Sequence, residues 1–132
     1  MKTLKNIAII TLVSVVSFSI ISCKKKKENE ITIELTSKVE GEKFSKDQKV
    51  SIKGTITASS EDIHEYTITI KNETSGATEF TKTEHANAKS ISFDESWINN
   101  VSDHSDMMLT IAAEDHDGKK ETFTAHFHCH PM

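Results

Sequence analysis

Donors for a transition-metal ion are concentrated in the last seven residues of the chain. The segment His126-Phe-His-Cys-His-Pro-Met132 supplies imidazole, thiol and thioether groups, which are ligands of zinc and copper. Alternate residues of a strand share a face, so His126, His128 and His130 line up together. Neighbouring histidines of such a row start about 7 Å apart, and two imidazoles can converge on one ion from there. The pattern predicts a metal-binding strand.

A second strand is expected to bring further donors to the same face. A His116-Asp-Gly118 loop pairs Asp115 with Lys119 and uses the glycine as its left-handed residue. Apolar residues of both strands then have odd numbers and share the core face. This register gives each histidine of the final strand a donor across the hairpin: Met108 opposite His126, Asp106 opposite His128, and His104 opposite His130.

The residues leave open the identity of the ion and the role of the thiol. Imidazole with Asp106 favours zinc, whereas Met108, Met132 and Cys129 favour copper. Cys129 has the parity of the core face, so it is either a buried thiol or a ligand if the chain end after Pro131 folds back. The other histidines are expected to be peripheral, with His64 near the edge of the core and His85 and His116 in solvated loops.

The start of the chain has the organisation of a bacterial export signal. A basic Met1–Lys5 segment precedes the apolar run Ile7–Ile21, which at about 15 residues is shorter than the about 20 needed to span a bilayer. The Ile20-Ile-Ser-Cys23 end of this run resembles the lipobox of bacterial lipoproteins, which implies cleavage before Cys23 and acylation of its sulfur. We expect residues 1–22 to be a signal peptide and residues 23–30 a lipidated, lysine-rich tether. The implied location is the bacterial outer membrane, on either its periplasmic face or the cell surface.

Composition restricts what the remaining domain, residues 31–132, can bind. It contains ten lysines, no arginine, 18 acidic residues and all seven histidines, for a formal charge of −8. Because it lacks both a basic field and the bidentate guanidinium fork, no nucleic-acid partner is expected. No Gly-x-Ser-x-Gly, phosphate-binding glycine loop or His-Glu-x-x-His motif occurs, so no enzymatic activity is expected either.

Short segments of alternating polar and apolar residues predict an all-β fold. About seven of them occur, around residues 31–36, 50–57, 65–71, 78–83, 91–93, 108–113 and 119–130. The polar segment 78–83 is expected at a sheet edge, and Trp97, Ile98 and Val101 in a connection that closes one end of the core. Such spacing is typical of an Ig-like antiparallel β-sandwich over residues 31–132.

The final hairpin also carries a family resemblance. Its Leu109–Gly118 arm, with an Ala-x-Asp-x-x-Gly turn, is similar to small Ig-like lipoproteins of Bacteroidetes, including an uncharacterised histidine-rich group that accompanies metal-uptake systems. The resemblance implies a metal-binding accessory protein with an outer-membrane transporter or receptor as its partner. The alternative is an Ig-like adhesion or scaffold module of an outer-membrane complex, with no metal role.

Overall fold

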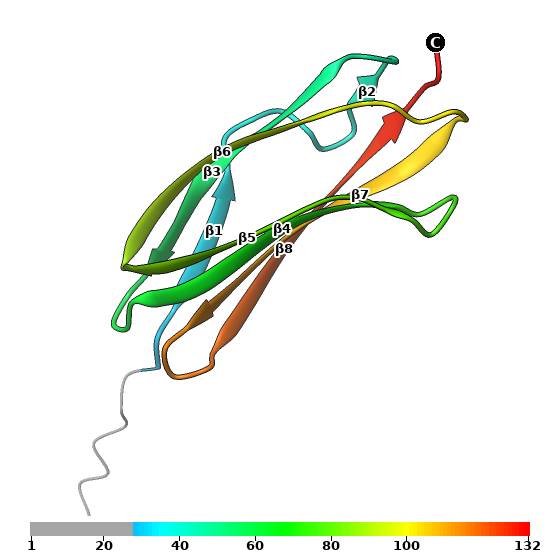
Figure 1. Cartoon of the computed structure of the whole chain (residues 1–132). Helices are drawn as coiled ribbons and strands as arrows, with labels where there is room; N and C mark the ends of the chain where they lie inside the picture. The colour runs from blue at the N-terminus through cyan, green and yellow to red at the C-terminus, as the bar shows by residue number, and fades with distance from the viewer. Residues whose placement is uncertain (1–27) are drawn as a thin grey trace, which may run out of the picture.

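The computed structural model describes residues 28–132, which form a β-sandwich (Figure 1). One sheet has the strand order β1 (Ile31–Leu35), β3 (Lys49–Ala58), β6 (Ser90–Ile98). The other has the order β2 (Lys43–Phe44), β8 (Lys120–Cys129), β7 (Ser105–Asp115), β4 (Ile63–Asn72), β5 (Thr78–Ala88). The all-β sandwich is confirmed, whereas the residues of the predicted signal peptide and the predicted lipidation site, Cys23, lie outside the described residues.

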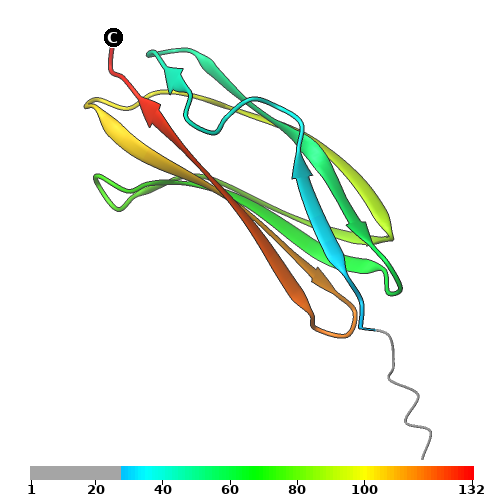
Figure 2. The ribbon, with the colours of Figure 1, turned by 180° about the vertical axis from the view of Figure 1, so that it is seen from behind.

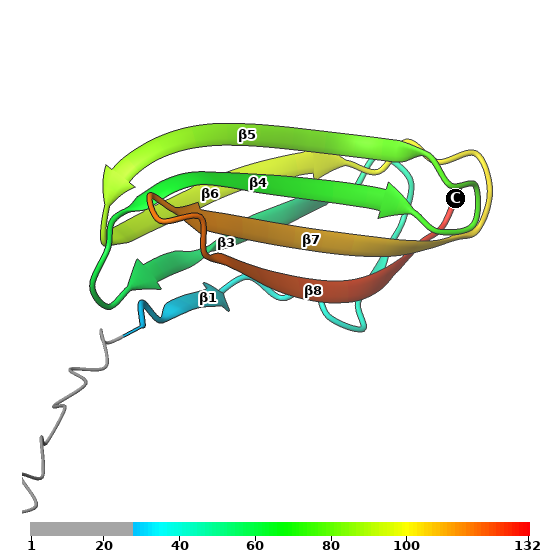
Figure 3. The same cartoon turned by 90° about the horizontal axis from the view of Figure 1, so that it is seen from below.

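The strand order of both sheets follows the Ig-like plan. With β1, β3 and β6 as strands A, B and E, strands β8, β7 and β4 correspond to G, F and C of the facing sheet. Figure 3 shows β5, β4, β7 and β8 side by side in front of the smaller sheet. The expected edge position of segment 78–83 is confirmed, since β5 is the outermost strand of its sheet and continues to Ala88.

One pairing departs from the antiparallel prediction. The two-residue strand β2 runs parallel to β8, with Lys43 paired to His128 and Phe44 to Cys129. The Phe44 ring packs edge-on against Phe127 with centroids 5.5 Å apart, which anchors this short strand on the sandwich. Strand β8 is therefore paired along both edges, by β7 and by β2.

The core lies between the sheets and follows the predicted alternation. Its fully buried side chains come from both sheets and include Val50, Ile52, Ile56, Ile63, Ile68, Ile70, Met107, Leu109 and Ile111. The prediction that Trp97 and Ile98 lie in a connection is wrong, because both belong to β6. Glu95 interrupts the apolar alternation of that strand at a core-parity position, where Lys82 of β5 neutralises it in an ion pair.

The chain enters and leaves the sandwich at opposite ends (Figures 1 and 2). At the entry, the buried side chain of Asn29 donates to Asp115 Oδ2 over 2.8 Å and accepts from the Ser60 N–H over 2.9 Å. Asn29, which the sequence assigns to the tether, thus packs on the domain. Residues 28–132 contain no helix able to cross a membrane.

Candidate metal site

The predicted register of the final hairpin is confirmed. Asp115 N–H donates to the Lys119 carbonyl over 3.0 Å, and Gly118 adopts a φ of +84°. The ladder that follows pairs Met108 with His126 and Asp106 with His128, as the parity argument requires. The donors of the hairpin therefore lie along the outer face of the five-stranded sheet and its end, and are called the donor row below. They are His104, Asp106, Met108, His126, His128 and His130.

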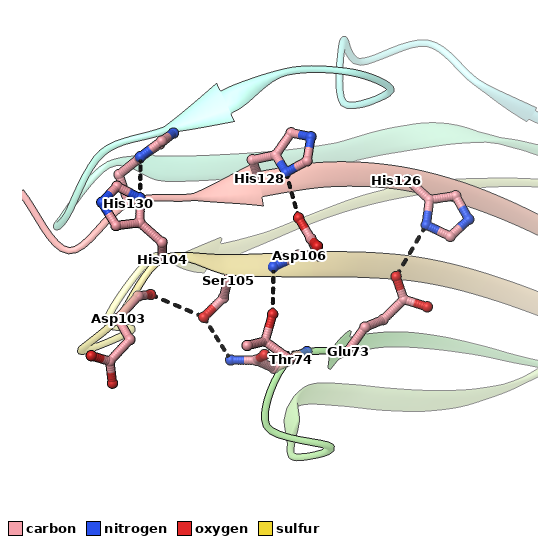
Figure 4. Close-up of polar contacts among 10 residues, drawn as sticks. Glu73, Thr74, Asp103, His104, Ser105, Asp106, His126, His128 and His130 are labelled. Atoms are coloured by element: carbon pink, nitrogen blue, oxygen red, sulfur yellow. Dashed lines mark hydrogen bonds and ion pairs between the residues drawn. The ribbon is translucent and has the colours of Figure 1, made fainter.

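His104 and His130 meet just beyond the last pair of the ladder, at the carboxyl-terminal end of the sandwich (Figure 4). Their Nδ1 atoms are 2.7 Å apart, and their rings are nearly perpendicular at 86°. Two neutral imidazoles hold this geometry when one Nδ1–H donates to the lone pair of the other. Two nitrogens on one tetrahedral zinc ion are about 3.3 Å apart. A metal ion can therefore take the place of the shared proton once the two Nδ1 atoms move apart by roughly 0.6 Å.

His128 and Asp106 form the neighbouring pair across the same two strands. His128 Nδ1 lies 2.7 Å from Asp106 Oδ1, and the two side chains are 53% and 68% exposed. The Asp106 N–H donates to Thr74 Oγ1 over 3.0 Å, which ties this part of β7 to the β4–β5 turn. A carboxylate on one imidazole nitrogen fixes the tautomer and leaves the other nitrogen available to a metal ion.

His126, the first histidine of β8, lies apart from these two pairs. His126 Nδ1 is 3.3 Å from Glu73 Oε2 of the β4–β5 turn, a partner that the sequence did not reveal. Met108 lies opposite His126 and is half-buried. Figure 4 shows the imidazoles of His126 and His128, on β8, and of His130, directly after it, in a row, each turned toward a different partner. They do not converge on one point in this arrangement.

A shallow groove of about 480 Å³ contains the first two pairs but not His126. The groove is lined by Lys43, Thr74, His104, Ser105, Asp106, His128, Cys129 and His130. Within residues 28–132, no three histidine, cysteine or acidic side chains are already arranged around a common metal position. Loading the groove therefore requires rotations of exposed side chains, which occur in picoseconds to nanoseconds.

Cys129 takes the buried position that its parity indicates. The residue is 1% exposed and is a free thiol at the end of the core. Burial, and secondarily the negative charge of Glu79, raises the pKa of the Cys129 thiol to about 11. Since the thiolate is the form that binds metals, the structure favours the imidazoles over this sulfur as ligands.

The backbone beneath the groove is held by residues that the sequence did not indicate. His126 N–H donates to Glu40 Oε2 over 2.7 Å, and His128 N–H to the Glu42 carbonyl over 2.9 Å. The side chain of Asn99 donates to the His130 carbonyl over 3.0 Å and is fully buried. Nothing in the sequence distinguishes Asn99 from its exposed neighbour Asn100.

The chain matches no family model and no curated protein. The groove provides three imidazoles, one carboxylate and an exposed rim within its lining. These groups suit a borderline divalent ion such as Zn²⁺ or Cu²⁺, whereas a site for Cu⁺ would use sulfur ligands.

Proposed function

We propose that this protein is an extracytoplasmic, membrane-anchored lipoprotein that binds one zinc or copper ion in the groove between β7 and β8. The observation that carries the proposal is the contact of His104 with His130, whose Nδ1 atoms are 2.7 Å apart beside the His128–Asp106 pair. Two imidazole nitrogens that already share one proton can share one metal ion after a small displacement.

In this site each side chain has a distinct role. His104 and His130 supply two Nδ1 ligands, and the proton between them moves to the Nε2 atom of the ring that donated it, so both imidazoles stay neutral. His128, held by Asp106, supplies a third through its Nε2 atom. The fourth position of a tetrahedral ion then faces the open groove, where water or a ligand of a partner protein can occupy it. An exchangeable position on an exposed rim suits an ion that is captured and passed on.

The location in the cell rests on the amino-terminal sequence. The Ile20-Ile-Ser-Cys23 segment supports acylation of Cys23 and anchoring to the outer membrane, on its periplasmic face or at the cell surface. The partner that fits such a location is an outer-membrane transporter or receptor to which this protein delivers the ion. Intact mass of membrane-extracted protein tests this part, since a mature chain that begins at any residue other than Cys23 contradicts it.

Metal titration of the full, untagged chain in detergent tests the groove. Zn²⁺ and Cu²⁺ are added separately while the ring signals of the histidines are followed by NMR. We expect the signals of His104, His128 and His130 to shift together with Zn²⁺ and to broaden together with paramagnetic Cu²⁺, with a Kd below about 0.1 mM, or roughly 5.5 kcal/mol of binding free energy. Acidification should release the ion, because ligation requires neutral imidazole.

A matched pair of variants separates the groove from a general histidine effect. His104→Gln should weaken binding at the groove at least tenfold, whereas His126→Gln removes an imidazole from the same sheet face, beside Glu73, and should leave it unchanged. Equal losses in the two variants, or no binding below about 0.1 mM in the wild type, would reject the metal-binding role. Absence of metal binding in the wild type would favour the alternative function, an Ig-like adhesion or scaffold module.

A further inference from the structure

The three histidines outside the donor row gather at the opposite end of the sandwich. The ring of His64 lies 4.9 Å from that of His116 and 5.6 Å from that of His85, measured between centroids. These residues come from the start of β4, from β5, and from the β7–β8 turn, so only the fold brings them together. The prediction that His85 lies in a loop is wrong, because it belongs to β5. Every one of the seven histidines of the chain thus belongs to one of two groups.

A β-bulge explains why His64 joins this group rather than the edge of the core. Between Ile63 and Glu65, β4 advances by two residues while β7 advances only from Asp115 to Glu114. The extra residue reverses the alternation, so Ile63 is buried and His64 exposed. The expectation that His64 lies near the edge of the core is therefore wrong. Bulges commonly re-aim a side chain next to a functional site.

The spacing of the His64 ring from each of the other two rings fits a shared ion. Two imidazoles on one tetrahedral zinc, with Zn–N bonds of about 2.0–2.1 Å, have ring centroids about 5 Å apart. The observed 4.9 and 5.6 Å bracket that value. The rings are tilted by 53° and 55°, so rotation about exposed side-chain bonds has to turn the nitrogens inward.

In two of these rings, one nitrogen already has a polar partner. His85 Nδ1 lies 3.3 Å from Glu65 Oε2, its partner across the β4–β5 ladder. His116 Nε2 lies 2.9 Å from Asn87 Oδ1, which accepts a hydrogen bond and thereby fixes the Nε2–H tautomer. The Nε2 atom of His85 and the Nδ1 atom of His116 are left with lone pairs for a metal. Such outer partners are typical of metal-binding histidines.

We infer that His64, His85 and His116 form a second site for a borderline divalent cation, of which Zn²⁺ is the best match to a set of imidazole nitrogens. The two groups are separated by the 11 residues of β7, which at about 3.4 Å per residue is more than roughly 30 Å. One ion therefore cannot bridge them. The second site lies where Asn29 joins the domain, at the end nearest the amino-terminal tether, and it exists whether or not the groove binds metal.

Zinc titration of the full chain in a background without the groove histidines tests the second site. The background combines His104→Gln, His128→Gln and His130→Gln, and zinc is titrated against a chromophoric chelator. We expect one equivalent to remain bound, with ring signals of His64, His85 and His116 shifting in NMR. Adding His64→Gln should weaken that binding at least tenfold, while adding His126→Gln should have no effect.

The controls keep a folding defect and a failed inference apart. His64 is exposed and the His85 side chain is 72% exposed, so neither substitution removes core contacts, and unchanged circular dichroism checks this. His85→Gln should reproduce the loss caused by His64→Gln. The inference is overturned if the background binds no zinc, or if both variants retain the affinity of the background. A wild type that binds zinc only through this group would instead reject the groove and uphold the second site.

Discussion

Replacing Asn99 with alanine should destabilise the domain and loosen the groove at the same time. The Asn99 side chain is 0% exposed, and its Nδ2 donates to the carbonyls of Phe44 and His130, each over 3.0 Å. Its Oδ1 accepts from the Val101 N–H over 3.2 Å. Asn99→Ala removes all of these interactions and takes this partner from the His130 carbonyl and the Val101 N–H, while the Phe44 carbonyl keeps its hydrogen bond from the His130 N–H.

The magnitude follows from the three lost hydrogen bonds. At about 1 kcal/mol each, the free energy of unfolding should fall by about 3 kcal/mol, and Tm by about 12–24 °C for a domain of this size. Urea unfolding followed by fluorescence of the single, buried tryptophan, Trp97, measures this loss. Because the His130 carbonyl is released, zinc affinity at the groove should fall as well.

The neighbouring residue provides the control for Asn99. Asn100 is exposed, so Asn100→Ala should change the free energy of unfolding by less than about 0.5 kcal/mol. Zinc binding by the distant His64 group should be unaffected by either substitution. Equal free energies of unfolding for Asn99→Ala and Asn100→Ala would refute the role of Asn99 as a partner of buried backbone groups.

Three further perturbations test other parts of the structure. Burial opposes ionisation of Asp115, but hydrogen bonds from Asn29 and from turn N–H groups outweigh burial and lower the pKa of the carboxyl group. The ionised carboxylate therefore stabilises the fold above about pH 4, and this stabilisation is lost as the pH falls through the folded-state pKa. The difference in stability between wild type and Asp115→Asn should accordingly disappear in urea titrations at acid pH. The Cys129 thiol, with its pKa raised to about 11, should react with a disulfide reagent at pH 8 far more slowly in the folded chain than in urea, and equal rates would place it outside the core. Gly54→Ala would put its Cβ 2.1 Å from the Glu34 carbonyl oxygen and should cost about 3 kcal/mol in the same urea assay, whereas a neutral effect would contradict this close approach of β1 and β3.

Short-range information was sufficient to predict the final hairpin. The alternation around Leu109 and Ile111 assigns the core face, and Gly118 fixes the loop, so only one register satisfies both. The contacts of Asp106 with His128 and of His104 with His130 follow from that register. These parts of the candidate site lie on adjacent strands, where sequence distance and spatial distance agree.

Features that depend on distant segments could not be predicted in the same way. The apolar pattern of β6 is broken at Glu95, whose charge is tolerated only because Lys82 of the other sheet lies beside it. The bulge at His64 depends on how β4 meets β7, and neither strand alone signals an extra residue. The parallel pairing of Phe44 with Cys129 likewise joins segments that local patterns treat separately.

The double pairing of β8 has a consequence for the order in which the protein folds. The hydrogen bonds from His128 and His130 to the segment around Phe44 join residues more than 80 positions apart, as does the bond from Asn29 to Asp115. When the chain emerges amino terminus first, the segments around Asn29 and Phe44 therefore have no partners until the residues of β7 and β8 have emerged as well. All-β domains with such high contact order fold in milliseconds to seconds. The groove is completed only when His128 and His130 have joined β7, so we expect it to acquire metal after the last strand has paired and not before.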